Sequence, residues 1–366
     1  MMPTQLATDE VESTFSANRQ EQALVGVLIG TAVGDALGLP MEGLSTQRQQ
    51  CLFPMPLRHR LVGRFGMISD DTEHTVMLAQ SILECPTDPI AFQRALARRL
   101  RWWLVGLPAG VGFATLRAIL KLWIGIPPTR SGVMSAGNGP AMRSALLGVY
   151  FADDPERRRQ FVHASTQITH RDPRAEIAAF AVAETAAWML NPGNDVADLL
   201  QSLSKLSELQ EWTAIIAKIR AGLSVNQPTA YFALEFGIAH GVSGYAFHSV
   251  PVAIYAAVRH RDDFQSALTE AIGCGGDTDT VGAITGALVG AHIGAAKIPL
   301  PWRSGIVEWP RSVTLLHRIG ERLSQQLVTL SVTGAIPYFW LAIPLRNLVF
   351  LAIVLAHGFR RLLPPY

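Results

Sequence analysis

The chain has 366 residues, of which 49% are hydrophobic and 16% charged, so it can bury the core of one large domain or two small ones. A net charge of only +2 gives no electrostatic case for nucleic acid as a partner. The three cysteines, Cys51, Cys85 and Cys274, show neither a disulfide framework nor a zinc-binding spacing. This cysteine usage favours a reducing compartment and predicts a cytoplasmic protein.

Helical patterns dominate from the N-terminus onward. Residues 1–20 are polar, contain no apolar stretch of signal-peptide type, and predict a disordered tail. Ala23–Leu39 is an apolar run in which Gly30, Gly34 and Gly38 share one helix face. Because a glycine in a helix interior costs about 1 kcal/mol, three in register indicate a face that another segment approaches closely.

Further helical stretches follow, mostly separated by Gly, Pro, Asn or Asp. They are predicted at Glu73–Leu83, Ile90–Trp103, Ala141–Tyr150, Pro155–Ile168, Pro173–Leu190, Val196–Ser202, Thr213–Gly222 and Val250–Arg259. A second glycine stripe, Gly282, Gly286, Gly290 and Gly294, favours a central helix of a soluble bundle, because polar residues interrupt its apolar run. No alternating strand pattern is long enough for a sheet, so we predict one compact, all-α, multi-helix domain over residues 21–326.

The last forty residues, 327–366, differ in composition from the rest of the chain. Their only charged side chains are Arg346, Arg360 and Arg361, and their apolar run nearly suffices to span a bilayer, although prolines interrupt it. We expect membrane contact through residues 335–366, as an anchor or monotopic hairpin with the last two arginines at the lipid surface. The alternative is an apolar extension that folds onto the domain or into a dimer interface.

Two acidic clusters far apart in the chain are its most informative feature. They are Ser69-Asp70-Asp71-Thr72 and Gly275-Gly276-Asp277-Thr278-Asp279-Thr280, and each precedes an apolar helical run. One such residue suffices to cap a helix, yet each cluster supplies several. Carboxylate and hydroxyl oxygens are the ligands that Mg²⁺ and Mn²⁺ prefer. If folding brings the two clusters together, they could hold one or two divalent ions.

Three further segments occur with these clusters in a fixed order. Gly34-Asp35-Ala36-Leu37-Gly38 is followed by Glu42, Ser135–Arg143 is a glycine-rich turn into a helix, and Thr169-His170-Arg171-Asp172-Pro173 precedes another helix. Order, spacing and context resemble the ADP-ribosylglycohydrolase family, whose members include the dinitrogenase reductase-activating glycohydrolases. The resemblance runs from about Ala23 to Trp302. It implies an all-α fold with two divalent cations, Mg²⁺ or Mn²⁺, at the base of an ADP-ribose cleft.

The resemblance also implies roles for individual residues. The metal ligands would be Ser69, Asp70, Asp71, Asp277, Asp279 and Thr280, and the catalytic residues would be Glu42, Asp71 and Asp277. The substrate would be bound by Ser135, Gly137, Asn138, Gly139 and His170, with the glycine turn as a diphosphate cradle. From the residues alone, Glu42 could be an exposed loop acid and His170 a residue at a helix start. Asp35, between two glycines of an apolar helix, is expected to have a structural, hydrogen-bonding role.

Taken together, the motifs predict a metal-dependent hydrolase that cleaves the glycosidic bond of ADP-ribose attached to a protein side chain or small acceptor. Such cleavage builds oxocarbenium-like charge at the ribose, which suits a carboxylate-rich metal site.

Two departures from the family pattern bear on the acceptor. Some members carry an aromatic residue at the place of Ala136, and arginine-directed members tend to carry an aspartate near the place of Gly110-Val111-Gly112. Since Gly110 cannot pair with a guanidinium, we expect a protein that is not strictly directed at arginine. Two other functions stay open, a two-metal phosphohydrolase and a catalytically inactive ADP-ribose-binding protein.

Overall fold

The computed structural model describes residues 4–191, 193–238 and 240–363, and within these ranges it contains helices, turns and isolated bridges but no β-strand. The all-α fold predicted from the sequence is therefore confirmed. The first half of the chain forms α1 (Thr4–Gly38), η1 (Leu39–Met41), α2 (Thr46–Leu52), α3 (Asp70–Glu84), α4 (Pro89–Val105), α5 (Phe113–Trp123), α6 (Pro128–Ser131), η2 (Ala141–Arg143), α7 (Ala145–Tyr150), α8 (Pro155–Gln167) and α9 (Pro173–Met189). The second half forms α10 (Val196–Ser204), α11 (Gln210–Ser224), α12 (Thr229–Leu234), α13 (Ala246–Arg259), α14 (Phe264–Gly273), α15 (Thr278–Ile293), η3 (Ala295–Lys297), α16 (Leu300–Ser304), α17 (Val313–Thr329) and α18 (Ala342–Arg360).

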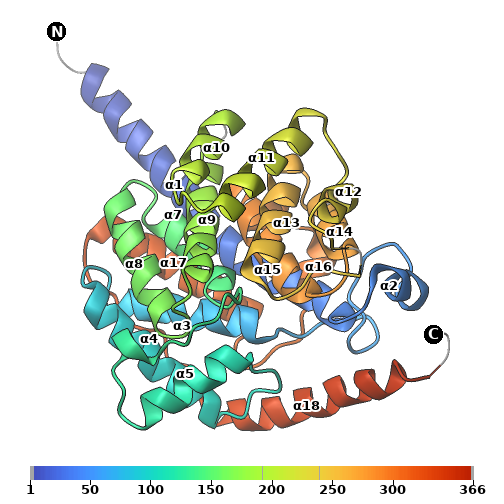
Figure 1. The fold of residues 1–366 in the computed structure, drawn as a ribbon. Coiled ribbons are helices and arrows are strands. Elements are labelled where there is room, and N and C mark those ends of the chain that lie inside the picture. Colours follow the sequence, from blue (N-terminus) through green and yellow to red (C-terminus); the bar gives the residue numbers. More distant parts are fainter. Residues whose placement is uncertain (1–3, 192, 239, 364–366) are drawn as a thin grey trace.

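The antiparallel pair α1 and α15 lies at the centre of the molecule (Figure 1). The two glycine stripes face each other along this pair. A Cβ added to Gly30 would lie 2.0 Å from the carbonyl oxygen of Gly286, and one added to Gly34 would lie 1.9 Å from that of Gly282. The two helix backbones are thus in direct contact, as the stripes predicted. This glycine seam brings the end of α1 beside the start of α15, where Thr278 Oγ1 donates to the Gly38 carbonyl at 2.9 Å.

Most predicted helices are present with shifted ends, and seven helices of the described residues lie outside the predicted stretches, namely α2, α5, α6, α12, α14, α16 and α17. The sequence analysis predicted a helix over Val250–Arg259. The structure starts α13 at Ala246 and runs it through Pro251, since Ala246 and Phe247 are buried in the core. Three of the missed helices have ten or more residues, and these are α5, α14 and α17. Each of them has an amphipathic pattern with buried residues on one side.

The N-terminal segment differs from the expected disordered tail. Helix α1 begins at Thr4 and continues through residue 20 into the buried run, and Figure 1 shows its first turns projecting away from the body of the molecule. The physical reason lies in the composition, because residues 4–25 contain neither glycine nor proline to end a helix. The domain boundary at residue 21 therefore falls inside a continuous helix.

The C-terminal segment folds onto the domain through one face. Before α18, the Ile336 amide donates to Gln80 Oε1 at 2.8 Å and its carbonyl accepts from Gln80 Nε2 at 2.9 Å, which ties the segment to α3. In α18 itself Ile343, Asn347 and Phe350 are buried. Within the described part of the chain, two helices are long and apolar enough to cross a membrane, but the most apolar window of Asn18–Met41 is completely buried in the core. Ala342–Arg360 differs, since only 28% of its most apolar window is buried.

Candidate functional site

Asp35, on the central helix α1, holds the start of α3 in place. Its carboxylate accepts hydrogen bonds from the Ser69 amide at 2.9 Å and from the amide and hydroxyl of Thr72 at 3.2 and 2.5 Å. These are orphan donors at a helix N-terminus, which a buried carboxylate satisfies well. Burial nevertheless raises the pKa of Asp35 to about 6, although these hydrogen bonds oppose the rise. Asp35 therefore has the structural, hydrogen-bonding role expected from the sequence.

The two acidic clusters meet at Asp71. Its Oδ2 accepts from the Thr280 hydroxyl at 3.2 Å and from the Ser69 hydroxyl at 3.3 Å, so side chains of both clusters contact one carboxylate oxygen. The other oxygen, Asp71 Oδ1, is buried with no hydrogen-bond partner in the described part of the chain. A buried carboxylate oxygen without a donor is unfavourable unless a proton or cation satisfies it. Folding thus brings the clusters together at the start of α3 and α15.

The acidic side chains at this place are crowded and mostly buried. Burial raises the pKa of Asp71 well above its usual range, and repulsion from Asp70 adds to the rise. Burial likewise raises the pKa of Asp70 well above normal, with repulsion from Asp35 next. For Asp279 the causes are burial and then repulsion from Glu42. The cluster therefore favours the binding of protons or of a cation, because either would lower the cost of burying the negative charges and the repulsion between them.

A divalent cation fits this site by its donor chemistry. The two clusters supply carboxylate and hydroxyl oxygens, and Asp71 Oδ1 is buried with no hydrogen-bond partner among the described residues. Such oxygen sets suit Mg²⁺ or Mn²⁺ better than softer metals. Among the described residues, however, no three His, Cys, Asp or Glu side chains are already arranged as a finished metal site. The arrangement thus supports oxygen ligands for a divalent cation but does not fix the number of ions.

Asp277 lies at the N-cap of α15 and is oriented by the glycine-rich turn. Its Oδ2 accepts from Asn138 Nδ2 at 2.6 Å, and the same amide donates to the Ser249 hydroxyl at 3.1 Å. Burial raises the pKa of Asp277, although the hydrogen bond from Asn138 opposes the rise. Asn138 therefore contacts an acidic residue of the second cluster directly, so the turn and the carboxylates belong to one site.

Glu42 lies at the rim of the acidic cluster, just after η1. The loop behind it pairs with the second cluster, since the Gly43 amide donates to the Gly276 carbonyl at 2.7 Å and the Gly276 amide donates to the Leu44 carbonyl at 2.7 Å. Both Gly43 and Gly276 have positive φ angles, 74° and 79°, which glycine adopts without strain. Partial burial raises the pKa of Glu42, repulsion from Asp277 raises it further, and Arg361 opposes both effects.

A small cavity of about 80 Å³ opens beside these acids. The residues that line it include Glu42, Ser69, Asp70 and Asp279 from the predicted set, together with Gly110. Its other polar lining residues are Glu73 and Arg346, and its apolar lining residues are Leu39, Pro108, Ala109, Phe350 and Val354. Three of these lining residues belong to α18, so the C-terminal helix forms part of the wall of the site.

The turn Ser135–Gly139 packs on His170. A Cβ on Gly137 would lie 3.0 Å from His170 Nε2, and one on Gly139 would lie 3.0 Å from its Cε1, so glycine allows the ring to approach the turn. Not every backbone N–H of the predicted diphosphate cradle is free to bind an anion, because the backbone N–H of Asn138 donates to the Gly244 carbonyl at 3.0 Å. Burial and the nearby Arg143 lower the pKa of His170 to about 3, so the ring is neutral.

Arg143 supports the turn Ser135–Gly139 through hydrogen bonds, and its side chain is completely buried. It donates to the Gly139 carbonyl at 2.8 Å, the Ser165 hydroxyl at 2.9 Å and the Thr169 hydroxyl at 3.1 Å. Burial lowers its pKa to about 9. It also lies 3.4 Å from His74 Nδ1, and these contacts with groups of the protein make Arg143 a support for the turn and for the segment before His170.

Sequence reasoning missed a buried ionic cluster next to the cavity. Glu73 accepts from Trp103 Nε1 and pairs with Arg311, and Arg346 of α18 lies 3.6 Å from it. Arg346 also pairs with Glu308 at 2.5 Å. One indication in the sequence was Arg346, the single charged residue of the run Ala335–Ala356, because a buried arginine needs an acidic partner. Nothing local in the sequence identified that partner as Glu308.

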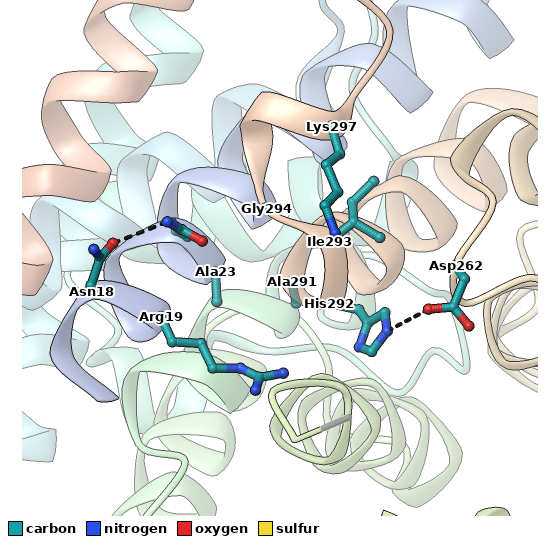
Figure 2. A pocket seen from close by; sticks show the side chains of 10 residues that line it. Asn18, Arg19, Ala23, Asp262, Ala291, His292, Ile293, Gly294 and Lys297 are labelled. Carbon is teal, nitrogen blue, oxygen red and sulfur yellow. Dashed lines mark hydrogen bonds and ion pairs between the residues drawn. The ribbon is translucent and has the colours of Figure 1, made fainter. Parts of the chain in front are cut away.

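A second hollow, of about 370 Å³, lies at the opposite end of the α1–α15 pair, near Arg19, Asp262, His292 and Lys297 (Figure 2). His292 is held there by Asp262 at 2.9 Å and by the Met189 carbonyl at 2.9 Å. None of the residues predicted to bind metal or substrate lines this hollow. The candidate site is therefore the small acidic cavity.

Comparisons with known proteins agree with the fold and the motifs. A family model described as ADP-ribosylglycohydrolase matches residues 16–331. An uncharacterized protein of Archaeoglobus fulgidus is 32% identical over 78% of this chain and 92% of its own. An ADP-ribosyl-[dinitrogen reductase] glycohydrolase of Rhodospirillum rubrum is 25% identical over 76% of this chain and 88% of its own. A solved ADP-ribosylglycohydrolase-related protein complex is similar with a TM-score of 0.61 and 26% identity, over 84% of this chain and 99% of that one.

Proposed function

The chain belongs to the ADP-ribosylglycohydrolase family and is a hydrolase of ADP-ribose linkages, and from this premise we propose that divalent cations bound at the acidic cavity are required for its activity. The observation that supports this proposal most directly is the meeting of both acidic clusters at Asp71, whose Oδ1 lacks a partner. A binding site for positive charge is the simplest outcome of so many buried acids. The alternative of a decayed site is disfavoured, because the acids of both clusters are present and close together.

The residues that would hold Mg²⁺ or Mn²⁺ are Ser69, Asp70, Asp71, Asp277, Asp279 and Thr280. When bound, the cation would supply positive charge that orients the ribose hydroxyls and lowers the pKa of a water. Of the six residues, Asp277 is held by Asn138, and Asp71 is held by Ser69 and Thr280. These hydrogen bonds fix the carboxylates before substrate arrives, which limits reorganisation during the reaction.

Glu42 is the proposed proton-transfer residue. It lines the same cavity as Asp70 and Asp279, and its raised pKa moves its proton affinity toward neutral pH, where a general acid or base works best. As the bond between the ribose anomeric carbon and the acceptor breaks, the acceptor would be protonated and positive charge would develop on the sugar ring. Asp71 and Asp277 do not line the cavity, but both repel Asp279, which does, and we assign to them the stabilisation of that charge. The apolar side chains of Leu39, Phe350 and Val354 line the same cavity and would limit the access of water to it.

We further propose that the acceptor is not strictly arginine. Gly110 lines the cavity and presents no side chain to it. A guanidinium would therefore meet no carboxylate at this position, although such a pair is the strongest available recognition of arginine. Serine-linked ADP-ribose, free ADP-ribose derivatives and small-molecule conjugates are the candidate substrates. The Rhodospirillum rubrum relative acts on ADP-ribosylated dinitrogen reductase by its name, so a protein-linked substrate is included.

The deciding experiment is release of free ADP-ribose by the full-length protein from serine-linked and arginine-linked peptides, with Mg²⁺, with Mn²⁺ or with EDTA. Release that requires a metal supports the proposal, and faster cleavage of the arginine-linked peptide would contradict the acceptor assignment. Release of phosphate or AMP in place of ADP-ribose would indicate the phosphohydrolase. Metal-dependent binding of ADP-ribose without release would indicate the inactive binding protein.

Two matched variants make this test specific for the acidic site. Asp279→Asn removes one buried carboxylate of the cluster and should lower the rate by at least about a hundredfold, the range of a lost catalytic or ligand group. Asp153→Asn changes an exposed carboxylate in the same way and should leave the rate unchanged. Equal activity of the two variants would refute the assignment of the metal site.

A further inference from the structure

Helix α18 has two faces of different character. Toward the domain it presents Arg346, Asn347 and Phe350, all buried. Away from the domain lies an outer stripe, which consists of Leu345, Leu348, Val349, Leu355 and Phe359. The exposed fractions of these five side chains lie between 51% for Leu355 and 67% for Phe359, with Leu345 at 65%.

 The turn after the helix extends the stripe with Leu362, which is 68% exposed. The spacing of three and four residues places the whole stripe along one side of the helix, opposite the buried face.

The chain segments that form this stripe and the loop beside it contain arginines and no acidic residue, and the acids next to α18, Glu308 and Glu42, lie beside Arg346 and Arg361. No aspartate or glutamate occurs in residues 43–69 or 322–366. The loop that follows α2 contacts α18 through a hydrogen bond between His357 and the Leu61 carbonyl. This loop exposes Arg58 and Arg64, which we call the basic rim, and it also exposes Phe65 beneath the Arg64 guanidinium. An apolar stripe beside a basic rim is typical of a helix that binds an anionic lipid surface.

The inner face shows that α18 is held on the domain and does not cross a bilayer. Arg346 pairs with buried Glu308 and also donates to the Ile68 carbonyl at 2.6 Å. Asn347 donates to the Gly106 carbonyl at 2.7 Å, and Arg361 donates to the Pro40 carbonyl at 2.6 Å. A spanning helix would have to break all these contacts and place Arg346 in hydrocarbon, which is costly. The contacts are compatible with a helix that lies in the plane of the surface.

We propose that the outer stripe and the basic rim dock this protein on an anionic phospholipid bilayer, with α18 lying flat in the headgroup region. A second copy of the chain is a poorer occupant, because a symmetric pairing of this face would bring like-charged arginines together. Anionic headgroups complement the same arginines. The inference is independent of the acceptor that the hydrolase acts on. It also places the acidic cavity near the lipid surface, since α18 forms part of the cavity wall.

The test is co-sedimentation of the full-length protein with vesicles of phosphatidylcholine alone or of equimolar phosphatidylcholine and phosphatidylglycerol. We expect binding to the anionic vesicles, and weaker binding at 1 M salt, where the screening length falls to about 3 Å. The triple variant Leu348→Gln, Leu355→Gln, Phe359→Gln should bind at least about a hundredfold more weakly, because it removes three apolar side chains from the contact. Arg58→Glu combined with Arg64→Glu should weaken binding to the anionic vesicles by about tenfold or more.

A matched control changes exposed apolar residues elsewhere. Val225→Gln combined with Leu234→Gln alters side chains that are 72% and 53% exposed near α11 and α12, and it should bind vesicles like the parent. Thermal unfolding of every variant verifies that it folds. Absence of binding to either vesicle, equal binding to both, or unchanged binding by the triple variant would overturn the proposal. A dimer that dissociates in the triple variant, without vesicle binding by the parent, would overturn it in favour of a second copy.

Discussion

Replacing Gly34 by alanine tests the contact on which the site is built. The added Cβ would lie 1.9 Å from the carbonyl oxygen of Gly282 and 2.4 Å from its carbonyl carbon. Ordinary contacts between such atoms lie near 3.5 Å, so the two helices would have to separate locally by roughly 1.5 Å. Neither contacted atom can rotate away, because both belong to the backbone of α15.

The expected loss of stability follows from two opposing effects. Alanine favours a helix interior over glycine by about 1 kcal/mol. Overpacking typically costs about 1–3 kcal/mol, and a clash with backbone belongs at the upper end of that range. The free energy of unfolding of Gly34→Ala should therefore fall by about 2 kcal/mol. With a urea dependence of about 3 kcal/mol per M, the unfolding midpoint should fall by about 0.7 M.

Urea unfolding followed by circular dichroism measures this change, and Gly358→Ala is the matched control. Gly358 lies in the interior of α18, and an added Cβ there would have no atom within 4 Å. The control should therefore be stabilised by up to about 1 kcal/mol. ADP-ribose release by Gly34→Ala should also fall, since Asp35 next to it holds the start of α3. An unfolding midpoint of Gly34→Ala at or above that of the parent would refute the reasoning.

Three further predictions concern the acceptor, the pH dependence of stability and the metal. Gly110→Asp should raise the ratio of arginine-linked to serine-linked cleavage by about tenfold, because an added Cβ has no atom within 4 Å and the carboxylate could pair with a guanidinium; an unchanged ratio in peptide assays would mean that this position does not face the acceptor. Burial raises the pKa of Glu270, but hydrogen bonds from Thr229 and Arg259 dominate and lower it from 4.5 to about 2. The ionised form is thus favoured in the folded state, so its contribution to stability is present above pH 4.5 and is lost as the pH falls toward 2. Glu270→Gln should lose about 2–3 kcal/mol at pH 7 and almost nothing near pH 2, and equal losses in urea unfolding at both pH values would contradict this. Mg²⁺ or Mn²⁺ at about a hundred times its dissociation constant should raise the free energy of unfolding by about 2.7 kcal/mol in the parent and much less in Asp279→Asn, as thermal unfolding with and without EDTA would show.

Much of the fold could be predicted because its signals are local or periodic. The two glycine stripes predicted a close helix contact, and Gly30 and Gly286 now form it. The two acidic clusters predicted a common site, and Asp71 and Thr280 are hydrogen-bonded across it. In both cases the residues are unfavourable in isolation, since interior glycines weaken a helix and buried acids repel one another. Their presence in the sequence therefore indicates that each segment contacts another segment that offsets this cost.

The remaining features depend on pairings that no local pattern specifies. The partner of Asp277 is Asn138, and the partner of Arg346 is Glu308. Each of these polar residues would be equally plausible on the surface, so only the tertiary arrangement identifies the pair. The inner face of α18 could not be predicted for the same reason. Phe350 is apolar like its exposed neighbours, and its place in the cavity wall follows from the fold.

The glycine seam also has a consequence during synthesis. Thr278 hydrogen-bonds to Gly38 across a separation of 240 residues, so the first core helix leaves the ribosome long before its partner. At about 5–20 residues per second, this delay is about 12–50 s. Throughout that interval Asn18–Met41, apolar enough to span a bilayer, has no α15 to pack against. We therefore expect this helix to need other contacts, within the chain or with chaperones, until α15 has emerged and can pack against it.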